Sequence, residues 1–246
     1  MSKIIDSLIL SKSEVIDYLD LEKKPVIFWD TCALLDIIRL PLPERNHTID
    51  ALEQIIEIKN KIVSKDVISL SSELCITEFN DHIDSWIQKL NTESKAISKR
   101  FNNFIGFINK SNIGIAPIAD IDISTYGLED LLCQIIFAIT KETIFVGQDS
   151  SFASFAHFRT TNKIPPAKKK GEYKDCYIWG TCLEIRKMCS DRSYSYNFLS
   201  SNTSDYAKAD KTSFVTEIDN ESTINRITYF PNFKIAYGLL RRDGII

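Results

Sequence analysis

The chain has 246 residues, of which 44% are hydrophobic and 26% charged, and its formal net charge is −3. These values are typical of a soluble globular protein and are enough for one large domain. Proteins that bind nucleic acid over a broad face are usually basic, so an anionic partner would have to be bound by a local patch or through a metal ion. No uncharged apolar run approaches the roughly 18 residues that a membrane span needs, so we expect no membrane segment.

The six cysteines do not indicate a metal or redox site. None forms a Cys-x-x-Cys pair, which disfavours a zinc site or a thioredoxin-like motif. Several fall inside apolar helical patterns, where a free cysteine acts as a small hydrophobic residue. With no signal-peptide pattern at the start, we expect a cytoplasmic protein with reduced cysteines.

The first third of the chain alternates between helical and strand patterns. Residues 1 to 20 carry a weak helical pattern, with Ser13 as the candidate N-cap. Pro25 precedes a short apolar run over residues 26 to 29, which predicts a buried strand of the parallel type. A short helix is expected over residues 32 to 39, and another begins at Thr48 with apolar positions at a period of 3.6. A second strand is expected over residues 67 to 71.

A long helical region begins near Glu73 and is not interrupted by strand patterns, so we interpret it as an elaboration on one side of a sheet. A loop with Gly114 and Pro117 follows. Further helices are expected over residues 124 to 140, 150 to 158, 174 to 189 and 233 to 241. Further strands are expected over residues 144 to 146, 196 to 201 and 227 to 229.

This order of elements predicts an α/β fold, a three-layer α/β/α sandwich with a mostly parallel central sheet and a helical insertion. We expect one domain over residues 1 to 246. The predicted parts are a core over about 24 to 90 and 143 to 210, a helical elaboration over about 91 to 142, and a C-terminal extension over 211 to 246.

Four carboxylates lie just beyond the expected carboxyl ends of strands, where folds of this class usually place their binding and catalytic residues. Asp30 directly follows the first strand, and Asp205 lies just past the strand that ends at Ser201. Glu78 follows the second strand by about one and a half helical turns. Asp175 opens its helix on the same stripe as Ile178, so its carboxylate is aimed toward the core.

An inward carboxylate needs a partner, because burying an unpaired charge is very costly. No arginine or histidine is spaced to serve all four acids. Carboxylate oxygens suit Mg²⁺ or Mn²⁺, and a divalent cation would therefore satisfy them together.

Other roles remain open for each acid taken alone. An aspartate between a strand and a helix is a common N-cap, and this explains Asp30, Asp175 or Asp205 singly about as well as a metal site does. Glu73 or Asp81 could take the place of Glu78. The four acids together, near one edge of the sheet, favour a metal site over four unrelated caps.

Four segments resemble the motifs of PIN-domain nucleases. They are Phe28-Trp29-Asp30-Thr31, the strand-then-Glu segment from Ser71 to Phe79, the helix start from Gly171 to Trp179, and the strand end from Phe198 to Tyr206. With Pro165-Pro166 and the lysine run upstream, the chain is similar to a bacterial subgroup of larger PIN-like domains. The likeness covers roughly residues 24 to 80 and 145 to 210. Asn202 stands where some members carry another acid.

The resemblance implies an endoribonuclease that cleaves phosphodiester bonds of single-stranded RNA with Mg²⁺ or Mn²⁺. Asp30, Glu78, Asp175 and Asp205 would hold the metal and act in catalysis, while Thr31 and Asn202 would orient them. A role as a toxin or defence effector would be consistent with this activity, with an antitoxin or another protein as partner. A homodimer through the exposed helices of the insertion is a further expectation.

Basic residues near Asp175 are the candidate substrate contacts. We expect the RNA backbone to meet Lys168, Lys169, Lys170, Lys174 and Arg159. A lysine run of this kind is otherwise a solvated loop, and its place beside an acidic site favours phosphate binding. Tyr173 and Tyr177 could stack on bases, and His82 could reach the site from Glu78's helix.

Three other classes of protein compete with this interpretation. A haloacid-dehalogenase-type phosphatase needs a second aspartate at the position of Cys32. A catalytically inactive PIN-like module that binds RNA or protein would not need all four acids. A flap-endonuclease-like DNA nuclease would show a dense basic stripe on its helical arch, and the central helices carry none.

Overall fold

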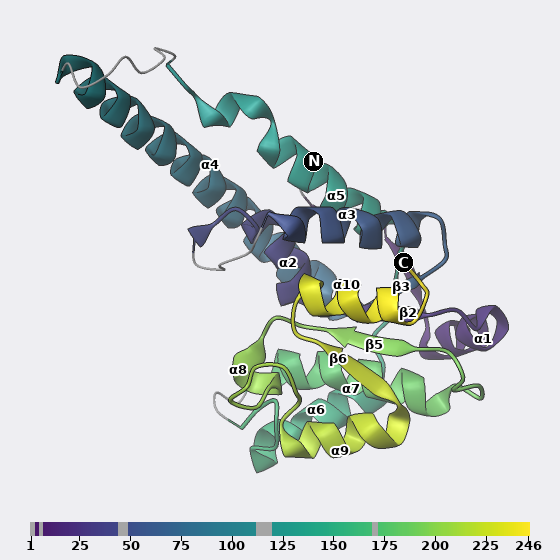
Figure 1. Cartoon of the computed structure of the whole chain (residues 1–246). Helices are drawn as coiled ribbons and strands as arrows, with labels where there is room; N and C mark the ends of the chain where they lie inside the picture. Colours follow the sequence, from purple (N-terminus) through teal and green to yellow (C-terminus); the bar gives the residue numbers. More distant parts are fainter. Residues whose placement is uncertain (1–2, 5–6, 44–48, 112–119, 169–171) are drawn as a thin grey trace.

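Six parallel strands form the central sheet in the described part of the chain, in the order β1-β4-β3-β2-β5-β6 (Figure 1). This computed structural model describes residues 3–4, 7–43, 49–111, 120–168 and 172–246. The strands are β1 (Leu8–Leu10), β2 (Val26–Trp29), β3 (Ile68–Ser72), β4 (Thr143–Val146), β5 (Tyr196–Leu199) and β6 (Ile227–Phe230).

Helices cover both faces of the sheet. One face carries α1 (Lys12–Glu22), α6 (Ser150–Asn162), α7 (Tyr173–Met188) and α9 (Thr216–Asn225). The other carries α2 (Thr31–Arg39), α3 (Asp50–Val63), α4 (Glu73–Lys110), α5 (Leu128–Lys141) and α10 (Phe233–Arg242). The predicted three-layer α/β/α sandwich with a parallel sheet is therefore confirmed.

Strand β2 is apolar along its whole length because it is buried on both faces. Val26 and Phe28 pack into the layer of α1, α6, α7 and α9, while Ile27 and Trp29 pack into the opposite layer. This alternation follows from the two-residue period of a strand. The strand lies at the centre of the sheet, between β3 and β5.

The N-terminal segment differs from the prediction. Residues 8 to 10, expected to be helical, form the edge strand β1 beside β4. The helix that follows is capped by Ser11 rather than Ser13, through a capping box in which Ser11 and Glu14 satisfy each other's backbone N–H groups. Strand β1 is short and largely exposed, so it lacks the buried pattern by which strands are predicted.

The predicted helical elaboration is present as a projecting arm. Helix α4 is 38 residues long and extends well beyond the sheet, and the chain returns beside it through the 3₁₀ helix η2 (Ile123–Tyr126) and α5 (Figure 1). The helix expected over residues 124 to 140 is divided at Gly127, whose φ of 69° is left-handed. The loop expected around Gly114 and Pro117 lies outside the described residues.

One segment, Ile123–Lys141, is long and apolar enough to cross a membrane, by length and composition alone. It is the only such segment among the residues that the structure describes. Its apolar residues Leu132, Ile135, Ile136 and Ile139 belong to the hydrophobic core between the sheet and α2, α3 and α4. Only one face of the segment is packed in this way, since 28% of its apolar window is buried.

The C-terminal segment is more closely integrated than the predicted boundaries state. Residues 211–246, expected to be an extension, supply the edge strand β6 and one helix to each face, α9 and α10. Phe214 stacks on Tyr229 with ring centroids 4.3 Å apart. The core therefore includes this segment, and α9 was missed because its buried residues other than Ile218 are polar, Ser222 and Asn225.

A buried cation joins α7 to the segments around it. The guanidinium of Arg186 is fully buried and donates to four backbone carbonyls, those of Asn225, Asp191, Arg192 and Tyr194, at 3.1 to 3.4 Å. No carboxylate within the described residues forms an ion pair with it. The carbonyl dipoles therefore replace water around the charge.

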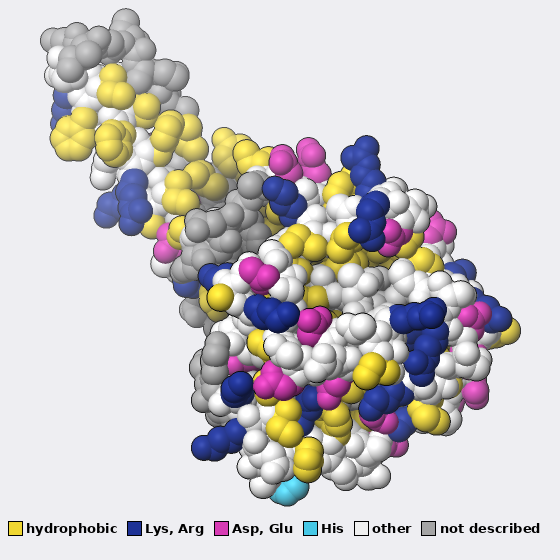
Figure 2. All heavy atoms as spheres, turned by 60° about the horizontal axis from the view of Figure 1, so that its bottom comes forward, with side chains coloured by type: hydrophobic (Ala, Val, Ile, Leu, Met, Phe, Trp, Pro, Cys, Tyr) yellow, Lys and Arg dark blue, Asp and Glu magenta, His cyan; other side chains and the backbone are white. Residues whose placement is uncertain are grey.

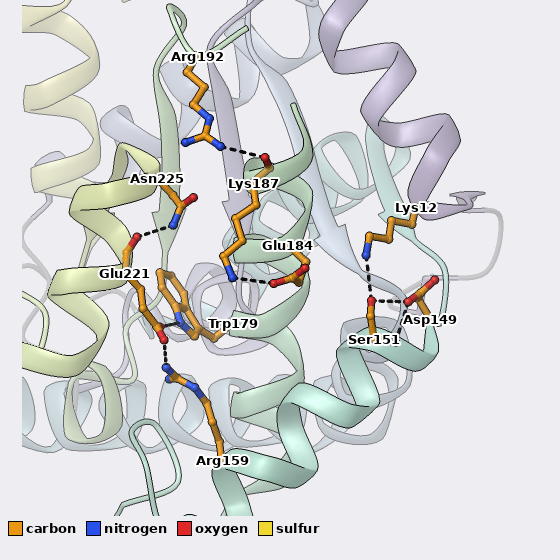
Figure 3. A network of polar contacts seen from close by, with 10 residues as sticks. All are labelled: Lys12, Asp149, Ser151, Arg159, Trp179, Glu184, Lys187, Arg192, Glu221 and Asn225. Carbon is orange, nitrogen blue, oxygen red and sulfur yellow. Dashed lines mark hydrogen bonds and ion pairs between the residues drawn. The ribbon is translucent and has the colours of Figure 1, made fainter. Parts of the chain in front are cut away.

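We expect Arg186→Met to lower the free energy of unfolding by about 3 kcal/mol, because it leaves buried carbonyl groups without donors. Chemical denaturation in urea measures this. Arg192→Met is the matched control, since Arg192 donates from a more exposed position to the carbonyl of Lys187 (Figure 3). Equal stability of the two variants would contradict a structural role for the buried guanidinium.

Candidate functional site

A cavity of about 440 Å³ opens at the carboxyl edge of the sheet, next to the ends of β2 and β5. After β2 the chain turns to one face of the sheet, into α2, and after β5 it turns to the other, through α8 (Thr203–Tyr206) and α9. Parallel sheets bind ligands at such a switch point. The cavity is lined by Asp30, Thr31, Cys32, Leu35, Arg39, Glu78, His82, Asp175, Ser201, Asn202, Thr203 and Ser204.

Asp30 stands between the ends of β2 and β5, and its side chain is 2% exposed. The strand register pairs Trp29 with Leu199, and this places Ser200 beside Asp30. Ser200 Oγ donates to Asp30 Oδ2 at 2.6 Å, and the Cys32 thiol donates to the same oxygen at 2.9 Å. Burial raises the pKa of Asp30 to about 6, although the hydrogen bonds from Cys32 and Ser200 act in the opposite direction.

Glu78 is brought to the same cavity by the first turns of α4. Thr31 Oγ1 donates to its Oε2 at 2.7 Å, so the hydroxyl next to Asp30 orients the second acid. The other two candidates for this position are placed elsewhere. Glu73 Oε2 accepts from the backbone of Gln148, and Asp81 is exposed. Glu78 is therefore the acid that α4 contributes.

Asp175 lies in the first turn of α7 and faces the cavity from the opposite layer. Asn202 Nδ2 donates to its Oδ2 at 3.2 Å. The pKa of Asp175 is raised to about 8, chiefly by burial and in addition by the negative charges of Asp30, Asp205 and Glu78. A carboxyl group in this state holds its proton at neutral pH unless a cation replaces it.

Asp205 is 7% exposed and lies behind the cavity, in α8. It is not among the lining residues, although its charge acts on Asp175. Ser204 Oγ donates to Oδ2 at 3.0 Å, while Oδ1 is buried and has no hydrogen-bond partner. A buried carboxylate oxygen without a donor is the kind of group that a bound cation satisfies.

The alternative role as helix caps does not hold for these aspartates. Asp30 occupies the N-cap position of α2 but makes no capping hydrogen bond with its side chain. Asp175 and Asp205 lie inside their helices, whose N-cap positions are held by Glu172 and Asn202. Their burial is therefore not explained by local helix stabilisation.

The donor set fits a hard divalent cation in chemistry and charge, because four carboxylates gather with one unsatisfied oxygen among them. Their present orientation is not that of a closed coordination cage. No group of three or more acidic, histidine or cysteine side chains within the described ranges is placed to hold a metal directly. The hydrogen bonds from Thr31, Ser200 and Asn202 hold these carboxylates in place without one.

The predicted basic contacts that the structure describes, Lys168, Lys174 and Arg159, do not line the cavity. Lys168 is exposed and pairs with Glu217 at 3.4 Å, and Lys174 is exposed beside Asp175. Lys169 and Lys170 lie outside the described residues. The lysine assignment therefore stays a prediction for the rim of the site.

Arg159 is a correction to the predicted substrate contacts. Its guanidinium is buried, donates to Glu221 and to the carbonyl of Pro165, and lies 4.6 Å from the ring of Phe155 (Figure 3). Glu221 also accepts from the indole N–H of Trp179 at 2.8 Å. The predicted phosphate contact is in fact part of the structural packing of α6, α7 and α9.

Several residues at the site were not assigned to it from the sequence. Arg39 lines the cavity, bonded to Asp36 and stacked on the ring of Trp86 at 3.9 Å. Cys32 and Ser200 hold Asp30. Ser200 falls inside the predicted strand over residues 196 to 201, whereas the strand ends at Leu199 and Ser200 is the first residue beyond it. Arg39, in the last turn of a short helix, gave no signal.

Comparison with known proteins identifies no relative. No family model, no curated protein sequence and no solved structure matches the chain.

The raised pKa values predict a stability that falls as the pH rises. The folded pKa values of Asp175 and Asp30, about 8 and about 6, lie above the ordinary value of 3.8. The folded protein therefore binds these protons more tightly than the unfolded chain, and the resulting stabilisation is lost progressively from pH 4 to pH 8. We expect Asp175→Asn to raise the free energy of unfolding by about 2 kcal/mol at pH 8 with a chelator present, and by little at pH 4.

Urea denaturation at pH 4, 6 and 8 measures this dependence. Asp81→Asn removes an exposed carboxylate of α4 and is the control, with no change expected at any pH. An Asp175→Asn variant that is no more stable than the wild type at pH 8 would contradict the destabilising effect of a buried Asp175 carboxylate beside the other acids.

Proposed function

We propose that the protein is a divalent-metal-dependent nuclease of the PIN type that cleaves phosphodiester bonds in single-stranded RNA. The observation that carries the proposal is the gathering of four carboxylates at the carboxyl edge of the sheet. Burial, together with the negative charges of the other three acids, raises the pKa of Asp175 to about 8, and none of the aspartates serves as a cap. A site that concentrates negative charge in this way requires a cation to meet a phosphate.

Asp30, Glu78, Asp175 and Asp205 would hold Mg²⁺ or Mn²⁺ in this proposal. The metal would polarise the scissile phosphate and lower the pKa of the attacking water. Asp205 is placed behind the others, and its buried Oδ1 is the oxygen most in need of a positive partner.

Neutral donors keep the acids apart and in position. Thr31 holds Glu78, Ser200 and Cys32 hold Asp30, and Asn202 holds Asp175. Burial raises the pKa of the Cys32 thiol well above its usual value, so it remains a proton donor to Asp30. Outer partners of this kind fix the orientation of ligand carboxylates before a metal arrives.

The substrate would approach from the open side of the cavity, where Arg39 and His82 are its basic lining residues. Arg39 is paired with Asp36, so its guanidinium is held rigidly for a phosphate oxygen. Lys174 lies one residue from Asp175 and is exposed, which suits contact with the backbone of an incoming strand. The choice of RNA over DNA, and a role as toxin or defence effector with an antitoxin partner, follow from the resemblance to PIN domains.

Metal binding is testable without any substrate. We expect millimolar Mn²⁺ to raise the melting temperature of the wild type by several degrees at pH 7.5, because a ligand at 10 to 100 times its Kd stabilises by about 1.4 to 2.7 kcal/mol. Asp30→Asn and Asp205→Asn should abolish the shift, while Asp81→Asn should keep it. Differential scanning fluorimetry with and without EDTA provides the measurement, and a shift that survives both site variants would refute the assigned ligands.

Cleavage is tested with end-labelled single-stranded RNA and DNA of the same sequence, in Mn²⁺ or EDTA. We expect metal-dependent cutting of RNA, reduced at least about 100-fold in Asp30→Asn and Asp175→Asn and unchanged in Asp81→Asn. Undiminished cutting by the folded site variants would refute the site. Cutting of DNA alone would indicate a flap-endonuclease-like DNA nuclease, and cutting of neither would favour a binding module.

A further inference from the structure

The outer half of α4 exposes an apolar stripe that no described residue of the chain covers. Ile97, Phe101, Phe104 and Ile108 are 44%, 44%, 70% and 39% exposed. Figure 2 shows hydrophobic side chains gathered along the projecting arm. Soluble monomers rarely expose contiguous apolar patches of more than a few hundred Å², and larger ones mark interaction sites.

The returning segment of the arm packs on a different face of α4. Ser98 Oγ accepts from the backbone N–H of Ile123, and Asn102 exchanges two hydrogen bonds with the backbone of Ile121. At about 100° per residue, the apolar stripe lies roughly a quarter turn around the helix from Ser98. The stripe is therefore available beside the contacts that hold the arm together.

The stripe has the spacing of a helix–helix seam. Its members are separated by four, three and four residues, the repeat by which one helix packs against another in a coiled coil. The order Ile, Phe, Phe, Ile also reads the same in both directions. A two-fold axis between two antiparallel copies of α4 would place Ile97 of one copy opposite Ile108 of the other, and Phe101 opposite Phe104.

We propose that this stripe is the interface through which two copies of the chain form an antiparallel dimer. A two-fold interface requires a surface that is complementary to itself, and the palindromic stripe meets this requirement. A different partner would give no reason for the symmetry. The proposal is independent of the nuclease assignment, because the stripe is on the outer arm and the acids are at the edge of the sheet.

The size of the patch indicates how strong the dimer is. The four exposed side chains, together with Phe107 at 73% exposure on the flank, present on the order of 500 Å² per copy. Two copies would bury about 1,000 Å², the lower limit of specific interfaces. Dimerisation in the micromolar range is therefore expected, with mass varying with concentration.

Sedimentation equilibrium of the full chain from 1 to 100 µM tests the proposal. We expect the wild type to shift from monomer to dimer across this range, and Phe104→Glu to remain monomeric with an unchanged circular dichroism spectrum. Leu21→Glu, which changes a 78% exposed leucine of α1, is the matched control and should dimerise like the wild type. A wild type that stays monomeric at 100 µM, or a Phe104→Glu variant that still dimerises, would overturn the proposal.

A charge-swap series tests the antiparallel register. Phe101→Lys and Phe104→Glu should each abolish the dimer. The double variant should restore it, because each lysine then faces a glutamate of the other copy, whereas a parallel arrangement would place like charges opposite one another. Restoration supports the two-fold antiparallel contact, and a monomeric double variant overturns it.

Discussion

Repulsion among carboxylates held at one edge of a parallel sheet is the constraint on which the site depends. Asp30 and Asp175 are buried or nearly so, and both have raised pKa values because water is excluded and like charges are near. The fold tolerates this arrangement because hydroxyl, thiol and amide donors from β2, β5 and their following turns hold the oxygens. The raised pKa values lower the stability of the fold at high pH, and the same concentration of negative charge is what the proposed cation site rests on.

The sequence predicts those parts of the structure that depend on local patterns. The buried strand beginning at Val26 is apolar throughout, and the buried strand beginning at Tyr196 is apolar apart from Asn197. The aspartates that follow them are recognisable from the chemistry of parallel sheets. The strand over residues 8 to 10 is exposed at the edge and has no such pattern. Arg159 looked like a phosphate contact because its partner, Glu221, is 62 residues away and only the folded chain brings them together.

The two ends of α4 belong to two different proposed sites. The first turns of α4 supply Glu78 to the cavity, while its outer half presents the apolar stripe. One rigid helix therefore links the proposed metal site to the proposed dimer contact.

The position of β5 has a consequence for how the chain is made. This strand is fifth in sequence, and it pairs with the central strand β2 on one side and with the edge strand β6 on the other. Until it emerges from the ribosome, β2 has an unpaired backbone edge that can add a strand from another nascent chain. Over the same interval Asp30 has neither Ser200 nor Asp205 beside it. Assembly of the acidic site and coverage of this edge of β2 therefore both depend on β5.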